Sequence, residues 1–378
     1  MDCWNSQPPV KRVLHIVMRW GEGRGGVKQF IRNTMDALPG DRYEQKVLSV
    51  GPITSDCQGF PLFGPVVEHG GAFSLLVAYA SLRNKLSEIG PDIVHIHCNN
   101  GLGFLYAAAA KHSGCRIRIV HSHSTSLGDD GFAKRIINVL LMLGFNRSAS
   151  ERVACSQSAG EFLFSKRPFE IVKNGIDLGR FRFDSSVREE IRKRFGIKHN
   201  ALVLGHVGSG IPVKNTSLIV DIVNELTARN VEVHAFLIGT GPEIRRLQER
   251  VEEYDLNAQV HFIGFVSDVW RYYSAMDMFM LPSFYEGLPI CLIEAQANGL
   301  PCVVSNSVSK DANITGLISN LSLEDDLSVW VDLVLSLASR QDSTRLEQSE
   351  ISACKLTAAG FSLATLCDQL DAIYLKSS

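Results

Sequence analysis

The stretch YEGLPICLIEA, at residues 285–295, carries most of the information about the fold. It follows the short apolar run MFML at 278–281, which has the length and composition of a buried strand. Pro289 suits the first turn of a helix, where its missing N–H costs nothing, and Gly299 and Pro301 predict the end of that helix. A buried strand, a loop and a helix in this order indicate one repeat of a parallel α/β sheet.

The same alternation of short apolar runs and longer amphipathic segments extends along most of the chain. The runs that predict strands lie at 13–18, 45–50, 93–97, 117–121, 152–155, 170–173, 202–207, 233–238, 260–265, 278–281 and 302–305. Near-continuous apolar strands separated by helices indicate parallel sheets covered on both faces. We therefore expect an α/β fold of two doubly wound, Rossmann-like domains that face a cleft, with ligands at the carboxyl ends of the strands.

The series of strands is interrupted near the middle of the chain. The turn signal NGID at 174–177 precedes a charged stretch at 188–194, which predicts one exposed helix before a new sheet begins. We therefore expect an N-terminal domain over 1–180 and a C-terminal domain over 181–360. In the tail, apolar residues recur at spacings of three and four, at Leu363, Leu366, Leu370 and Ile373. This spacing predicts a final helix within 361–378 that can pack back on the N-terminal domain.

Composition indicates a globular protein without a strong charge bias. Of the 378 residues, 45% are apolar and 21% are charged, and the formal net charge of −2 gives no reason to expect nucleic acid as a partner. The nine cysteines form no C-x-x-C pair, which argues against a zinc site or a disulfide framework and fits a reducing compartment. With neither a signal peptide nor an apolar run of about 20 residues, we expect a cytoplasmic protein, with the inner face of the plasma membrane as an alternative.

The start of the helix predicted after 278–281 is a candidate anion site. Backbone N–H groups around 287–290 lack partners within the helix and carry positive potential, so they suit a diphosphate. Glu286 precedes this helix and Glu294 lies inside it. Two carboxylates beside an anion site suit a ligand that also carries hydroxyl groups. The alternative, two solvated surface acids, is awkward for Glu294, because its helix is apolar all round and a buried carboxylate needs partners.

The stretch from about 260 to 304 resembles the retaining nucleotide-sugar glycosyltransferases of family 4, in the branch associated with capsule and exopolysaccharide assembly. The phrases EGLP at 286–289 and EAQANGLP at 294–301 are close matches to that branch. Weaker similarity extends upstream, at 239–242, 174–177 and 25–27. The resemblance implies a GT-B fold that holds a nucleotide sugar mainly on its C-terminal domain and a glycan or lipid-linked sugar acceptor on its N-terminal domain.

The resemblance also implies roles for individual residues of the C-terminal domain. Glu294 would bind the ribose hydroxyls, Glu286 would hold a hydroxyl of the transferred sugar, and Lys214 would grip the diphosphate. The other donor-binding candidates are Gly208, Ser209, Gly264, Phe265, Val266, Gly287, Leu288, Pro289 and Ile290. Of these, 264–266 would lie near the base, and 287–290 would meet the phosphates or the sugar. Lys214, Glu286 and His123 are the expected catalytic residues.

Ser209 departs from the family pattern. In GSGIPVKN, at 208–215, Lys214 matches the pattern, but Ser209 stands where an arginine is expected. A guanidinium makes a bidentate phosphate contact that a hydroxyl cannot replace. Either another basic residue compensates, or donor binding and turnover are weak. A degenerate transferase that acts as a binding subunit is therefore an alternative.

Two histidines follow a predicted strand of the N-terminal domain. His121 and His123 are two positions apart, so they lie on the same side of that strand. The resemblance favours His123 as the group near the anomeric carbon and the phosphate, with His121 as second choice. A metal site is the alternative, but no third ligand is evident in the sequence. We expect a further pair, His95 and His97, to be structural or to line the cleft.

The glycine-rich loop after the first predicted strand has two interpretations. Gly21, Gly23 and Gly26 spell G-x-G-x-x-G before a predicted helix, where backbone N–H groups meet a phosphate. An NAD site also needs an acid at the end of the second strand, and Gly-Pro stands there instead. We favour a loop that borders a phosphate or the acceptor, with Gly25, Gly26 and Val27 as candidates. An NAD-linked oxidoreductase or epimerase, and a turn without a ligand, are the alternatives.

The sequence contains no Asp-x-Asp triplet of the kind that holds a divalent ion on a diphosphate. We therefore expect no metal and no other cofactor, with the leaving group neutralised by Lys214 and the helix N-terminus. The family implies front-face transfer of a hexosyl unit with retention, and we favour a UDP-sugar as donor. The segment 132–147 predicts a basic-headed apolar helix, which can face anionic lipid as a peripheral membrane contact or be a half-buried domain helix.

Overall fold

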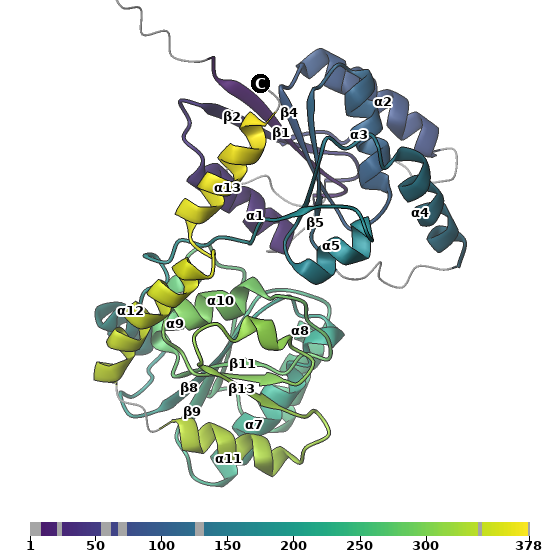
Figure 1. Cartoon of the computed structure of the whole chain (residues 1–378). Coiled ribbons are helices and arrows are strands. Elements are labelled where there is room, and N and C mark those ends of the chain that lie inside the picture. Colours follow the sequence, from purple (N-terminus) through teal and green to yellow (C-terminus); the bar gives the residue numbers. More distant parts are fainter. Residues whose placement is uncertain are drawn as a thin grey trace, which may run out of the picture. The chain divides into compact units, whose positions relative to one another are not determined.

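A computed structural model of the chain describes residues 9–20, 25–53, 62–66, 74–124, 132–338 and 342–376. The chain forms two compact units (Figure 1). The first comprises Met1–Gly175 together with Leu363–Ser378, and the second comprises Ile176–Ser362. The chain thus leaves the first unit after Gly175 and returns to it at Leu363, where the sequence analysis placed the boundaries after 180 and 360.

The first unit is a parallel sheet of seven strands in the order β3-β2-β1-β4-β5-β6-β7. Its strands are β1 Lys11–Val17, β2 Tyr43–Ser49, β3 Leu62–Phe63, β4 Ile93–Cys98, β5 Ile117–Ser122, β6 Glu151–Ala154 and β7 Glu170–Ile171. Its helices are α1 Gly26–Ala37, α2 Ser74–Ile89, α3 Leu102–His112, α4 Phe132–Phe145, α5 Gln157–Phe164 and α13 Leu363–Leu375. Side chains alternate along each strand, so Val13 and Ile93 pack with α1 and α13 while Leu14 and Val94 pack with α2 and α3.

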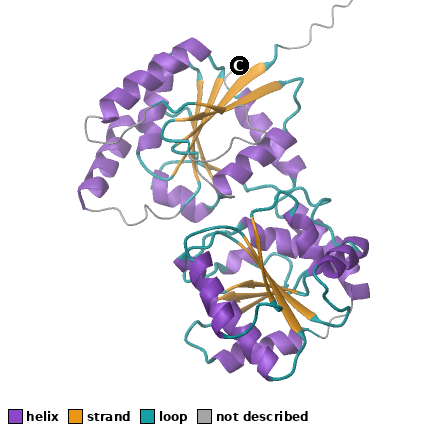
Figure 2. Cartoon of the chain, turned by 180° about the vertical axis from the view of Figure 1, so that it is seen from behind, coloured by secondary structure: helices purple, strands orange, loops and turns teal. Residues whose placement is uncertain are grey.

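The second unit is a parallel sheet of six strands in the order β10-β9-β8-β11-β12-β13. Its strands are β8 Leu202–Val207, β9 Val233–Ile238, β10 Val260–Gly264, β11 Met278–Leu281, β12 Cys302–Ser305 and β13 Ile318–Leu321. Its helices are α6 Ser185–Arg194, η1 Pro212–Lys214, α7 Ser217–Ala228, α8 Ile244–Glu253, α9 Val269–Ala275, α10 Ile290–Ala297, η2 Lys310–Ala312, α11 Leu327–Leu337 and α12 Asp342–Ala358. In both units the helices flank the sheet (Figure 2), and a separate apolar cluster lies on each face.

The predicted strands all occur, with bounds that agree to within two or three residues. The sequence analysis missed β3, which has only two residues, and β13, whose strand ISNL carries two polar residues. The expectation of an exposed helix at 188–194 is wrong for Arg188 and Arg192, which are only 6% and 4% exposed. Both guanidiniums contact Asp277, just before β11, each at 2.6 Å, so a distant carboxylate allows their burial.

The last helix, α13, packs within the first unit. Leu366, Leu370, Ile373 and Tyr374 are buried against the strands and α1. Two polar contacts hold the same face: the Tyr43 hydroxyl donates to Asp371 at 2.6 Å, and Lys11 Nζ donates to the Tyr374 carbonyl at 3.2 Å. Among the described residues, no helix is both long enough and apolar enough to cross a membrane.

Candidate functional site

Two glycine-containing loops lie side by side at the carboxyl end of the second sheet. The Gly208 N–H, after β8, donates to the Ile238 carbonyl at 3.0 Å, at the end of β9. A Cβ on Gly239, where φ is +135°, would lie 1.8 Å from the Gly208 oxygen, and one on Gly241 would lie 2.3 Å from the Gly210 oxygen. Only glycine fits at 239 and 241, because the two backbones approach so closely.

Lys214 and Glu286 form an ion pair beside these loops. Lys214 ends η1 and Glu286 lies between β11 and α10, and Lys214 Nζ contacts Glu286 Oε1. The side chains are only 17% and 11% exposed. The Ser283 hydroxyl donates to the same carboxylate oxygen at 2.9 Å, and the Phe284 N–H donates to the Val213 carbonyl at 2.8 Å. The structure therefore brings together two residues that the sequence assigned to separate parts of the donor.

The α10 N-terminus follows Glu286 directly. Pro289 is the N-cap, with φ −72° and ψ 123°, so it precedes the helix and is not in its first turn as the sequence suggested. Within the described chain, no side chain caps this end and no acid lies in its first turn, which leaves the positive end of the helix dipole available to an anion. Gly287 is exposed, and a Cβ placed on it would meet open space. Leu288 and Ile290 anchor the turn in the core.

Glu294 is buried in α10, with 4% of its surface exposed. The Tyr273 hydroxyl, from α9, donates to Glu294 Oε2 at 2.9 Å. A carboxylate in such an apolar helix was expected to need partners, and this phenol is one of them. Its charge and its position one turn inside the helix that starts at the anion site make it a candidate acceptor for ligand hydroxyl groups.

The loop after β10 joins the same edge of the sheet. The Gly239 N–H donates to the Gly264 carbonyl at 2.9 Å, and Gly264 has a φ of +72°. Phe265 is exposed, and Val266 packs on the core. Ser209 is exposed, and its carbonyl accepts from the Ile211 N–H at 2.9 Å. The donor-binding candidates of the second unit thus come from the end of β10, from the loops after β8, β10 and β11, and from α10.

His206 in β8 is a polar residue of this edge that sequence reasoning missed. Its Nδ1 lies 3.0 Å from the Met280 carbonyl, and within the described chain its buried Nε2 has no hydrogen-bond partner. Burial lowers the pKa of His206 to about 4, so the ring is neutral. A Cβ on Gly208 would lie 2.9 Å from this Nε2, which places the ring directly under the Gly208 loop. A histidine near the end of a strand otherwise composed of apolar residues was the available signal.

Five histidines cluster in the first unit, and the sequence analysis had paired only four of them. In register, His15 of β1 lies beside His95 of β4, and His97 lies beside His121 of β5. His121 and His123 stack with ring centroids 4.0 Å apart. His123 alone of the five is partly exposed, and His121 is fully buried. Burial lowers the pKa of His15 to about 4 and that of His123 to about 3, so these imidazoles are neutral.

The predicted phosphate or acceptor loop is described only in part. Gly21 and Gly23 lie outside the described residues. Gly25 is the N-cap of α1, with φ −78° and ψ 148°, and Gly26 begins the helix. Val27 packs against an apolar cluster that includes Trp20.

The helix predicted at 132–147 is α4, and its apolar side chains are largely exposed. Ile136, Ile137, Val139, Leu140 and Leu143 are each between 42% and 70% exposed. Met142 and Phe145 of the same helix pack against an apolar cluster of the first unit, so α4 is half-buried and also presents an exposed apolar surface.

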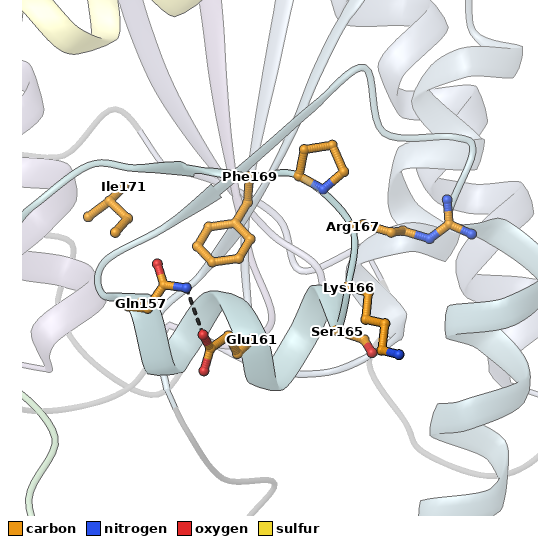
Figure 3. Close-up of a pocket in the computed structure, with 8 residues that line it drawn as sticks. Gln157, Glu161, Ser165, Lys166, Arg167, Phe169 and Ile171 are labelled. Carbon is orange, nitrogen blue, oxygen red and sulfur yellow. Dashed lines mark hydrogen bonds between the residues drawn. The ribbon is translucent and has the colours of Figure 1, made fainter.

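A surface pocket in the first unit is formed by residues other than those predicted (Figure 3). It is lined by Gln157, Glu161, Ser165, Lys166, Arg167, Pro168, Phe169 and Ile171. Gln157 donates to Glu161 at 2.7 Å across α5, and a Cβ on Gly160 would lie 2.1 Å from the Phe169 ring. The glycine therefore shapes the pocket wall, but none of the candidate residues above belongs to it.

Comparison with known proteins identifies the family. Residues 187–315 match the family described as Glycosyl transferases group 1, and residues 24–180 match the one described as Glycosyltransferase Family 4. EpsF of Bacillus subtilis (strain 168), named as a glycosyltransferase, is 31% identical over 354 residues, which cover 87% of this chain and 88% of EpsF. The chain belongs to the family 4, group 1 glycosyltransferases.

Two further proteins resemble this glycosyltransferase. The UDP-Gal:alpha-D-GlcNAc-diphosphoundecaprenol alpha-1,3-galactosyltransferase of Escherichia coli is 25% identical over 297 residues, 74% of this chain and 76% of that enzyme. Anabaena Alr3699/HepE, solved in complex with UDP-glucose, matches with a TM-score of 0.73 at 18% identity, over 96% of this chain and 98% of that one. The prediction of a GT-B fold is confirmed. The comparisons favour a transferase over the NAD-linked alternative.

Proposed function

We propose that this glycosyltransferase takes a UDP-sugar as donor and binds it at the carboxyl edge of the second sheet. The observation that carries the proposal is the ion pair of Lys214 and Glu286 beside the open N-terminus of α10, one turn from the buried carboxylate of Glu294. Lys214 and the helix N-terminus neutralise the diphosphate, Glu286 accepts from a sugar hydroxyl, and Glu294 accepts from the ribose. The UDP and UDP-glucose complexes of Alr3699/HepE support uracil as the base.

The transferred unit is a hexose, and the acceptor is a glycan or a lipid-linked sugar of cell-surface polysaccharide biosynthesis. The E. coli relative, whose name gives a diphosphoundecaprenol-linked acceptor, supports this class. Transfer proceeds with retention and without a metal on the diphosphate, because fixed cationic groups stabilise the leaving group. His123 lies near the anomeric carbon, and Gly25, Gly26 and Val27 border the acceptor or a phosphate.

The donor assignment is tested with Glu294→Gln, which removes the charge and keeps the shape. Calorimetry should show UDP affinity about 10- to 100-fold lower, the effect of losing charge-assisted hydrogen bonds to two ribose hydroxyls. Glu225→Gln, on the surface helix α7, is the matched control and should bind as the wild type does. Unchanged affinity in Glu294→Gln would contradict the assignment, and a preference for GDP or NADH would contradict the choice of UDP.

Turnover of a UDP-hexose by the purified chain, with retention seen in the product's anomeric NMR signal, would support the enzyme. Binding of UDP without turnover on any lipid-linked or glycan acceptor would favour the degenerate binding subunit that Ser209 raised as an alternative. Activity in EDTA equal to that in added Mg²⁺ is the expected outcome for metal independence.

We propose further that α4 rests on an anionic membrane surface, where a lipid-linked acceptor would be found. Its exposed aliphatic residues lie between exposed Arg135 and Arg147, and the sequence has no acid from 132 to 150. Such a helix inserts its apolar face while its cations meet lipid phosphates. Leu76 and Val77 on α2, 73% and 50% exposed, add apolar surface on a helix that packs against α3 as α4 does.

Vesicle sedimentation tests the membrane contact. The wild type should bind vesicles containing phosphatidylglycerol more tightly than pure phosphatidylcholine. Leu140→Ser/Leu143→Ser should weaken binding at least tenfold, because burying each leucine side chain in the membrane contributes about 1.5 kcal/mol of binding free energy. Val329→Ser, at an exposed apolar residue of the second unit, is the control. Equal binding by all three proteins would contradict the proposal.

A further inference from the structure

A chain of four side chains leads from β2 to His123 in the first unit. Gln45 Oε1 lies 3.1 Å from His15 Nε2, and His15 Nδ1 lies 3.0 Å from His97 Nε2. His97 Nδ1 lies 2.9 Å from His123 Nε2. Each imidazole before His123 thus uses both ring nitrogens, one toward each neighbour, and the chain crosses the adjacent strands β2, β1 and β4.

The amide of Gln45 determines which atom donates and which accepts in each hydrogen bond of this series. Its nitrogen donates to the Thr34 carbonyl at 3.4 Å, which turns its oxygen toward His15. An amide oxygen can only accept a hydrogen bond, so the proton of His15 must lie on Nε2. The orientation of the amide is therefore fixed by a backbone carbonyl that itself can only accept.

The tautomer of one ring determines the tautomer of the next, because a neutral imidazole carries a single N–H. Burial lowers the pKa of His15 to about 4 and of His97 well below its usual value, so both are neutral. With its proton on Nε2, His15 accepts at Nδ1 from His97 Nε2–H. His97 then accepts at Nδ1 from His123 Nε2–H, which leaves Nδ1 of His123 with a lone pair.

We propose that Gln45, His15 and His97 are positioning residues that hold His123 as the Nε2–H tautomer, so that its Nδ1 accepts a hydrogen bond from a hydroxyl of the bound sugar. The role of His123 rests on the proposed function, but the tautomer does not. Because the chain ends on a neutral amide and not on a carboxylate, it gives no counter-charge to an imidazolium. His123 therefore acts as a neutral acceptor and not as a proton donor.

A metal ion is the competing explanation of the cluster. Within the described chain, ligand atoms of His97, His121 and His123 all lie within 4.8 Å of one another, and the buried Nε2 of His121 has no hydrogen-bond partner. Two nitrogens on one tetrahedral zinc, at about 2.0–2.1 Å from the ion, stand roughly 3.3 Å apart. The pair His97 and His123 is closer, at 2.9 Å, and alternates donor with acceptor as a hydrogen bond requires. The distances therefore favour the hydrogen-bonded chain.

Nitrogen-15 NMR of the full chain labelled at histidine reads the tautomers directly, and replacing each histidine in turn assigns the signals. His15, His97 and His123 should all show the neutral Nε2–H pattern. Gln45→Met removes the acceptor and should shift the tautomer ratio of His15 about five- to tenfold toward Nδ1–H, since one hydrogen bond sets the bias. Gln45→Glu keeps an acceptor oxygen and should restore the wild-type pattern at pH 8.

Kinetics with the UDP-sugar donor supplies the second measurement. Gln45→Met should lower kcat about fivefold with the donor KM unchanged, and Gln45→Glu should recover it at pH 8. An Nδ1–H signal from any of the three rings in the wild type would overturn the proposal. So would a stoichiometric metal in the purified protein, or a wild-type kcat in a Gln45→Met variant whose tautomers have shifted. A wild type with the expected tautomers and no turnover would instead contradict the proposed function.

Discussion

Replacing Lys214 by methionine should destabilise the second unit and weaken UDP binding, and the two effects separate the two roles of this side chain. Breaking a fully buried ion pair costs about 3–5 kcal/mol, whereas an exposed pair contributes about 0–1 kcal/mol. With Lys214 and Glu286 at 17% and 11% exposure, the pair lies nearer the buried limit. Ser283 still donates to the stranded Glu286 carboxylate, so we expect Lys214→Met to lower the free energy of unfolding by about 2–3 kcal/mol.

A double-mutant cycle measures the interaction energy between Lys214 and Glu286. Lys214→Met/Glu286→Met strands no charge, so it should cost less than Lys214→Met alone and give a coupling energy of about 2 kcal/mol. Hydrogen exchange as a function of urea, read on peptides of the second unit, measures each variant without interference from the first unit. Lys198→Met is the matched control, because the Lys198–Glu232 pair is more exposed, at 71% and 39%, and should cost less than about 0.5 kcal/mol.

Calorimetry with UDP completes the test. Lys214→Met should bind UDP about tenfold or more weakly, since a charge-assisted contact to the diphosphate is lost. Glu286→Gln should bind UDP at least as tightly as the wild type, because Lys214 no longer has a competing carboxylate. Additive stability effects would refute the pairing, and UDP affinity unchanged in Lys214→Met would refute its role at the phosphates.

Three further outcomes follow from the structure. The first unit should lose stability as pH falls below 6.5, because histidines of the unfolded chain take up protons and the buried histidines, whose pKa values are lowered by burial, do not. Each histidine lowers the free energy of unfolding by about 1.4 kcal/mol per pH unit until the pH reaches its folded pKa. Urea titrations with equal midpoints at pH 7.5 and pH 5.5 would contradict this prediction. Gly239→Ala should lower the free energy of unfolding by about 3 kcal/mol or more, because its Cβ meets the Gly208 oxygen. Gly316→Ala, with φ +86° and open space around it, should lower it by only about 1 kcal/mol. Equal melting temperatures of the two variants would show that the loops can separate. Ser209→Arg should raise UDP affinity about tenfold through a bidentate phosphate contact, and no change in calorimetry would mean that another cation already serves the phosphates.

The local sequence pattern was sufficient to predict most of the strands and the burial of Glu294. The apolar runs have the period and length of buried strands wherever they are four residues or longer, and α10 is apolar around its whole circumference, so Glu294 had to be inside. The two-residue β3 carried no such pattern.

Partners from distant parts of the chain could not be predicted in this way. Arg188 and Arg192 form part of a charged stretch typical of a surface helix, and only the fold brings Asp277 to them. His15 is a single histidine in an apolar strand, and its contact with His97 depends on the strand order. Lys214 and Glu286 were each assigned to the ligand, while their contact with each other depends on η1 lying against the loop after β11.

The return of α13 to the first unit has a consequence during synthesis on the ribosome. The second unit is one continuous segment, whereas the first needs Leu363–Leu375 to cover Phe30, Ile93 and Ile117 and to supply Tyr374 to His95 at 2.8 Å. At about 5–20 residues per second, roughly 10–40 s pass between the synthesis of β7 and that of α13. During that interval the whole second unit is synthesised, while the part of the first sheet that α13 covers stays exposed. The N-terminal half of this chain is therefore the last to be finished, and its open face is the natural place for a chaperone to bind.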